Sequence, residues 1–178
     1  MQQAKHHGTS GIDTAAIRAA AKNMDDGAVT AGYRGDRKLV INLLNGALAT
    51  ELVCVLRYKR HHYTVAGREN GPIKAEFLEH ALEEQGHADQ IAERIVQLNG
   101  EPDFNPASLA ERSHAEYDDA KDVKAMIKAN LIAERVAIES YRQMIEKIGD
   151  SDPTTRQMLV GIMAKEEEHA DDMRDLLG

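Results

Sequence analysis

Four glutamates occupy sequence positions where a helical pattern calls for apolar residues. They are Glu51, Glu84, Glu134 and Glu166. Each has apolar residues three, four and seven positions away, so its carboxylate is expected on the apolar face of a helix. Two histidines, His87 and His169, follow Glu84 and Glu166 by three residues, on the same face and one turn further on. Burying an unpaired charge is costly, so these carboxylates need a partner in the core.

The six side chains together have the chemistry of a site for two metal cations. Four carboxylates balance the charge of two divalent ions, and mixed oxygen and nitrogen ligands favour iron or manganese. The set contains no thiolate, which argues against a structural zinc site. One glutamate from each of two helices, with a Glu-x-x-His pair from each of two others, is a known ligand pattern of di-metal carboxylate bundles.

The spacing of these residues repeats between the two halves of the chain. Glu84 follows Glu51 by 33 residues, and Glu166 follows Glu134 by 32. The first glutamate of each half has a tyrosine seven residues later (Tyr58 and Tyr141), and the second begins the same pattern, Glu-x-x-His-Ala-Asp. With 16 Glu and eight His in the chain, about one such pair arises by chance, and we read Glu111-x-x-His114 as that one. Glu83, Glu167 and Glu168 are expected to be solvated charges.

Four long helices must position the ligands. Apolar stripes predict them over Asp36 to about Ala66, Pro72 to Asn99, Asp122–Ile148 and Thr154–Leu177. The connection between the second and third, Glu101–Lys121, is long enough to cross the bundle and is expected to hold a short helix near Ser108–Tyr117. Residues 1–36 are predicted to form a tail with a short helix within Ile12–Lys22, and residues 37–178 the bundle. We therefore predict an all-α fold, a ferritin-like four-helix bundle with a long crossover.

Composition narrows the classes of function. The chain has 178 residues, 42% hydrophobic and 29% charged, which suits one globular domain with a tail. Its single cysteine, Cys54, excludes an internal disulfide framework, fits a reducing compartment and is read as a core thiol. We see neither an apolar run of membrane-spanning length nor a signal peptide, so the expected location is the cytoplasm, without a membrane partner. A net charge of -8 argues against DNA binding.

From about residue 37 to residue 177 the sequence resembles the bacterioferritins and the bacterioferritin-like mini-ferritins of Dps-like type. The residues that carry the resemblance are Glu51, Glu84-Gln85-Gly86-His87, Glu134 and Glu166-Glu167-Glu168-His169. The resemblance implies that Glu84 and Glu166 bridge two irons, that Glu51 with His87 and Glu134 with His169 complete the two sites, and that Tyr58 assists nearby. The implied activity is that of a ferroxidase, which oxidises Fe(II) with O2 or H2O2 and mineralises ferric oxide in a hollow shell.

Two departures from the bacterioferritin pattern shape these expectations. Gln85 stands where bacterioferritins carry their haem-ligating methionine, so we do not expect haem. The sequence has no fifth helix after the fourth, and its N-terminus is extended, so we expect a homo-oligomer of 12 rather than 24 subunits. Two irons per subunit are expected, with Mn or Zn as possible substitutes.

Other functions remain open at this stage. Rubrerythrin-type peroxidases and manganese catalases use related carboxylate bundles, and a non-catalytic, DNA-protecting shell is a third class. His80, with Glu76 and Glu79 nearby, fits either an iron entry site or hydrogen-bonded interface residues.

Overall fold

The computed structural model describes residues 11–178 and divides the chain into two units. The first ends at Tyr33 and contains the short helix α1 (Thr14–Ala20), which lies within the predicted Ile12–Lys22. The second unit, Arg34–Gly178, contains four long helices: α2 (Arg37–Thr64), α3 (Gly71–Gln97), α5 (Val123–Ile148) and α6 (Pro153–Asp175). Short helical turns lie between them: η1 (Arg68–Asn70), α4 (Leu109–Arg112) and η2 (Gly149–Ser151). Across residues 11–178 there is no strand, so the predicted all-α bundle is confirmed.

Aspartates begin three of the long helices. Asp36, Asp122 and Asp152 each accept a hydrogen bond from the backbone N–H three residues later, at Leu39, Ala125 and Thr155. These caps satisfy backbone donors that the first helical turn leaves unpaired. They place the helix starts within a residue or two of the predicted positions.

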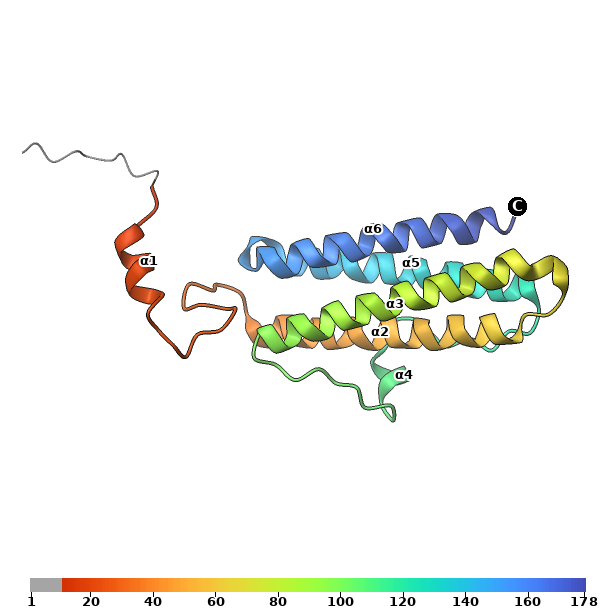
Figure 1. Cartoon of the computed structure of the whole chain (residues 1–178), viewed down its shortest axis with the longest axis horizontal. Helices are drawn as coiled ribbons and strands as arrows, with labels where there is room; N and C mark the ends of the chain where they lie inside the picture. Colours follow the sequence, from red (N-terminus) through yellow and green to blue (C-terminus); the bar gives the residue numbers. More distant parts are fainter. Residues whose placement is uncertain (1–10) are drawn as a thin grey trace, which may run out of the picture. The chain divides into compact units, whose positions relative to one another are not determined.

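The four long helices form two antiparallel hairpins. α2 packs mainly against α3, and α5 against α6. Figure 1 shows that the connection from α3 to α5 runs back along the length of the bundle, so α3 and α5 point in the same direction. This is the long crossover expected from the sequence.

The crossover contains less helix than expected. α4 covers only Leu109–Arg112, because the backbone groups that follow bond to side chains of α2 instead of to one another. Thr50 accepts from the His114 N–H, while Arg57 and Arg60 donate to the carbonyl oxygens of Glu116 and Ala120. Gly46 permits this close approach, since a Cβ there would lie 3.1 Å from the His114 ring.

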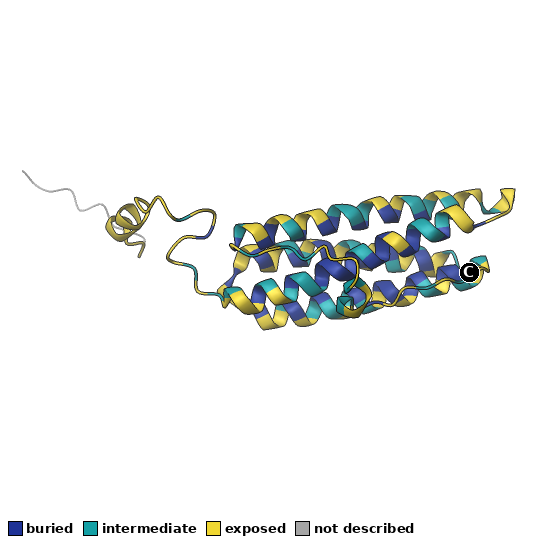
Figure 2. Cartoon of the chain, turned by 90° about the horizontal axis from the view of Figure 1, so that it is seen from below, coloured by how far each residue is buried: buried dark blue, intermediate teal, exposed yellow. Residues whose placement is uncertain are grey.

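The core lies along the inner faces of the four helices, where buried residues alternate with exposed ones (Figure 2). Large apolar side chains fill both halves of this core, among them Leu44, Phe77, Met126 and Leu159. The four glutamates singled out from the sequence are each no more than 1% exposed. The core therefore surrounds a charged centre.

One helix reaches the length and apolar composition of a membrane span, although no apolar run of that length was expected from the sequence. Within the described residues α2 is long and apolar enough to cross a membrane, by length and composition alone, because an 18-residue window in it reaches a mean hydropathy of 1.9. Just over half of that window, 56%, is buried inside the protein. Glu51 lies in the same helix and faces the core. These properties are those of a bundle's core helix.

Candidate metal centre

All four long helices contribute to one cluster of carboxylates and imidazoles. α2 supplies Glu51, α3 supplies Glu84 and His87, α5 supplies Glu134, and α6 supplies Glu166 and His169. The two histidines are 6% and 1% exposed, so the whole cluster is withdrawn from solvent. The structure brings together all six residues that were predicted from the sequence as ligands.

The cluster consists of two overlapping groups of ligand atoms. One contains Glu51, Glu84, His87 and Glu166, and the other contains Glu84, Glu134, Glu166 and His169. Within each group the ligand atoms all lie within 4.8 Å of one another, and Glu84 and Glu166 belong to both. This geometry suits two neighbouring cations with two shared carboxylates.

Short contacts hold the first group around His87. Its Nδ1 lies 2.8 Å from Glu166 Oε1, 3.3 Å from Glu84 Oε2 and 3.4 Å from Glu51 Oε2. In the second group His169 Nδ1 is 3.6 Å from Glu84 Oε1 and 3.7 Å from Glu166 Oε2. The two imidazole rings lie 6.1 Å apart, one for each cation position.

Several buried polar atoms of the cluster have no hydrogen-bond partner. They are Glu51 Oε2, Glu84 Oε1, Glu134 Oε2, both carboxylate oxygens of Glu166, and His169 Nδ1. Buried polar groups in proteins are almost always paired, so a concentration of unpaired acceptors needs an explanation. Cations placed among these lone pairs would satisfy them, and oxygen and imidazole donors suit iron, manganese and related divalent ions.

Two tyrosines support the cluster from opposite hairpins. Tyr58 of α2 donates to Glu134 Oε1 of α5 over 2.5 Å, and Tyr141 of α5 donates to Glu51 Oε1 of α2. Each tyrosine thus fixes one oxygen of a carboxylate and leaves the other oxygen free for a cation. Tyr58 was among the predicted site residues, whereas Tyr141 was noticed only through its place in the internal repeat.

Glu83 has a closer relation to the centre than its sequence position indicated. We expected a solvated charge, but its Oε2 lies 2.6 Å from His169 Nε2. This contact orients the ring so that Nδ1 faces the interior. Glu167 and Glu168 are exposed, as expected.

The metal-free cluster retains protons. Burial would lower the pKa of His87, but the nearby carboxylates of Glu166, Glu51 and Glu84 outweigh it and raise that pKa to about 12. The pKa of His169 is raised to about 11, since the nearby carboxylates of Glu166 and Glu84 likewise outweigh burial. Burial and the charge of Glu84 raise the pKa of Glu51 to about 8, and burial raises the pKa of Glu134 well above its ordinary value.

Glu84 differs from these two carboxylates. Burial and the neighbouring Glu166 act to raise its pKa, but the nearby imidazoles of His169 and His87 outweigh them, so the pKa of Glu84 is lowered. It is therefore ionised and positioned between the two imidazoles. A shared ligand for two cations needs this state.

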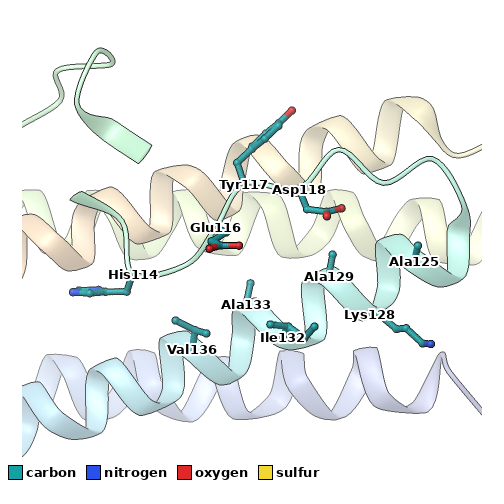
Figure 3. A pocket seen from close by; sticks show the side chains of 10 residues that line it. All are labelled: His114, Glu116, Tyr117, Asp118, Ala125, Lys128, Ala129, Ile132, Ala133 and Val136. Atoms are coloured by element: carbon teal, nitrogen blue, oxygen red, sulfur yellow. The ribbon is translucent and has the colours of Figure 1, made fainter. Parts of the chain in front are cut away.

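The second Glu-x-x-His pair on the crossover is far from this chemistry. Glu111 is exposed, and His114 bonds to Thr50. A hollow of about 450 Å³ lies between the crossover and α5, and its lining includes Ile132 and Val136. His114 lies at one end of this lining (Figure 3). None of the six clustered residues lines it. Cys54 is buried and contacts Arg57, as expected of a core thiol.

Comparisons with known proteins all point to the same family. A family model described as a ferritin-like domain matches residues 41–178. The chain is 33% identical over 132 residues to a nutrient stress-induced DNA-binding protein of Synechococcus sp., a match that covers 71% of this chain and 74% of that protein. It is 30% identical over 141 residues to the bacterioferritin of Desulfovibrio desulfuricans, with 78% and 75% covered.

Solved structures resemble the chain over the same region. A dodecameric thioferritin, the bacterioferritin-related protein of Bacteroides fragilis, is 35% identical and superposes with a TM-score of 0.77, covering 81% of this chain and 87% of that one. The D. desulfuricans bacterioferritin, whose structures describe a diiron site in different catalytic states, is 28% identical with a TM-score of 0.71, and 83% of each chain is covered.

Proposed function

The chain belongs to the ferritin-like domain family, and on that premise we propose that it is a ferroxidase that stores or detoxifies iron. The observation that carries the proposal is the buried cluster of four carboxylates and two imidazoles, whose unpaired acceptors converge on two positions. A relative with 28% identity is described as having a diiron site, which supports iron as the metal. In this reading Fe(II) is the substrate.

The six residues of the cluster divide into three pairs by their role. Glu84 and Glu166 are shared by the two irons, Glu51 and His87 complete one site, and Glu134 and His169 complete the other. Their four negative charges match two divalent ions. The ligands Glu51 and Glu134 are held in orientation by Tyr141 and Tyr58, which donate to them.

The proposed reaction balances in electrons. Two Fe(II) ions lose one electron each, and one O2 accepts both with two protons to give H2O2. With H2O2 as oxidant, the same two electrons and two protons give two molecules of water. The six clustered side chains are at most 6% exposed, so the protein limits the access of water to the site.

Storage of the product needs an enclosed space, so we propose a closed homo-oligomer in the cytoplasm, with residues 37–178 as its bundle. The B. fragilis relative is described as dodecameric, which supports 12 subunits. Twelve chains of 19.7 kDa give about 236 kDa. Light scattering distinguishes this mass from the roughly twofold larger mass of a 24-subunit shell.

DNA binding is not part of the proposal, although the Synechococcus relative carries that function in its name. The formal net charge of this chain is -8, and non-specific DNA binding depends on many contacts between basic residues and phosphates. Retention of duplex DNA by the assembled protein at 0.15 M salt would overturn this exclusion.

The test of the proposed activity is aerobic oxidation of Fe(II), followed by measurement of iron per particle. We expect Glu84→Gln and Glu166→Gln each to abolish fast oxidation, because each removes a carboxylate shared by both irons. Glu111→Gln, in the other Glu-x-x-His pair, is the matched control and should oxidise iron at the wild-type rate. Wild-type rates in both site variants would refute the assignment. Peroxide consumption without a mineral core would favour the peroxidase or catalase class instead.

A further inference from the structure

A second cluster of metal-ligating side chains lies one helical turn from the centre just described. Glu76 and His80 stand four residues apart on α3, and Asp172 faces them from α6. His80 Nε2 is 3.3 Å from Glu76 Oε1 and 3.5 Å from Asp172 Oδ2. The potential ligand atoms all lie within 4.8 Å of one another. A single cation could contact all three side chains.

The buried end of this cluster is held in one orientation. His80 is 2% exposed, and its ring stacks on that of His169 with centroids 4.0 Å apart. Its Nδ1 lies 3.1 Å from the Tyr58 hydroxyl oxygen. Tyr58 has one proton and donates it to Glu134, so its oxygen accepts a hydrogen bond from His80 Nδ1–H.

This hydrogen-bond order determines which nitrogen of His80 can bind a metal. In the neutral ring with the proton on Nδ1, Nε2 carries a lone pair. That lone pair points toward two carboxylate oxygens, which are also acceptors. Three acceptors that converge without a proton between them form a cation site, and the Tyr58 hydroxyl is the outer partner that commonly orients a ligating histidine.

The donors also indicate the kind of cation. One imidazole and two carboxylates are the donor types of the neighbouring centre, and they suit first-row divalent metals better than Mg²⁺ or Ca²⁺, which prefer oxygen alone. The side chains of Glu76 and Asp172 are 34% and 43% exposed. A cation can therefore arrive from solvent while its remaining positions keep water.

We propose that Glu76, His80 and Asp172 form a third divalent-cation site, separate from the paired centre and joined to it through His80. The inference that its occupant is Fe(II) on the way to the centre rests on the proposed ferroxidase function. His80 touches that centre twice, through the stacked ring of His169 and through Tyr58, which bonds to Glu134.

The test is an anaerobic titration of the assembled full-length protein with Co(II). Calorimetry measures the number of ions bound, and the visible spectrum reports on the bound ion. We expect three Co(II) per subunit in the wild type. The double variant Glu76→Gln/Asp172→Asn should lose one Co(II) and keep the other two. The matched control, Glu79→Gln/Asp171→Asn, removes the same charge from neighbouring exposed positions of the same helices and should keep all three.

A second double variant separates this proposal from the proposed function. Glu84→Gln/Glu166→Gln should lose the paired ions and retain the third, with its spectrum. A wild type that binds Co(II) only at Glu76, His80 and Asp172 would support the third site and refute the paired centre. A wild type that binds two ions, neither of which is lost in Glu76→Gln/Asp172→Asn, would overturn the third site and leave the paired centre standing.

Discussion

Loading the paired centre with metal should release protons. At pH 7 the metal-free cluster retains protons on His87 and His169, whose pKa values are raised to about 12 and 11. Burial raises the pKa of Glu134 well above its ordinary value, and Glu51, with a pKa raised to about 8, also retains its proton. Ligands bind metals in their deprotonated forms, so each of these protons must leave.

The expected magnitude follows from this count. About three protons or more should leave for each pair of divalent cations bound at pH 7, from His87, His169 and Glu51. Each coupled proton is worth tenfold per pH unit, so the affinity for the pair should rise at least about a thousandfold per pH unit near neutrality. The affinity must rise with pH, because protons compete better with metals for the ligands with raised pKa values as the pH falls. Above pH 8 Glu51 is already ionised, so the release should drop by about one proton.

Anaerobic calorimetry of Zn(II) binding, repeated in buffers with different heats of ionisation, measures the number of protons directly. Glu51→Gln carries no titrating carboxyl at that position and should release one proton fewer than the wild type. Glu111→Gln should match the wild type. Release of one proton or none for each pair at pH 7 would refute the electrostatic account of the cluster.

Three further outcomes are expected. Reconstitution with haem should give no Soret band at one haem per two subunits, because Gln85 offers no thioether; such a band would contradict this. Glu51→Gln should stabilise the metal-free protein by up to about 3 kcal/mol at pH 7. The reason is that the raised pKa of Glu51 makes the wild type lose stability as the pH rises from about 4.5 to 8. Denaturant unfolding at pH 5 and 7 should show the gain only at the higher pH. Arg94→Ala should cost about 3 kcal/mol in the same assay, because it removes the buried guanidinium that balances the charge of Asp152, 3.0 Å away; a cost below 1 kcal/mol would contradict this.

The sequence predicted those parts of the molecule that depend on periodicity along one helix. Asp36 and Asp122 mark helix starts through contacts three residues away, and Glu51 or Glu84 can be assigned to a core face from apolar neighbours within one or two turns. Such local rules place an element or a side chain without knowledge of the partner helix. The six clustered residues were found in this way.

Contacts between helices were less accessible to prediction. The bond from Glu83 to His169 joins residues 86 positions apart, and Glu83 on its own has the pattern of an exposed charge. Asp172 completes the cluster around His80 from another helix, so the sequence alone offered only its α3 neighbours. The crossover lost its expected helical turns to side chains of α2, a competition that local propensity does not describe.

The paired centre lies across the seam between the two hairpins. The helices pack mainly within each hairpin, α2 against α3 and α5 against α6, yet both groups of ligand atoms include side chains from both hairpins. Bound cations would therefore cross-link the two hairpins. After chelation the hairpins would be held together by apolar packing, by the hydrogen bonds of Tyr58 and Tyr141, and by the crossover connection. The stability of the folded subunit therefore depends on the metal concentration around it, because ions that bind only the folded bundle stabilise it by mass action.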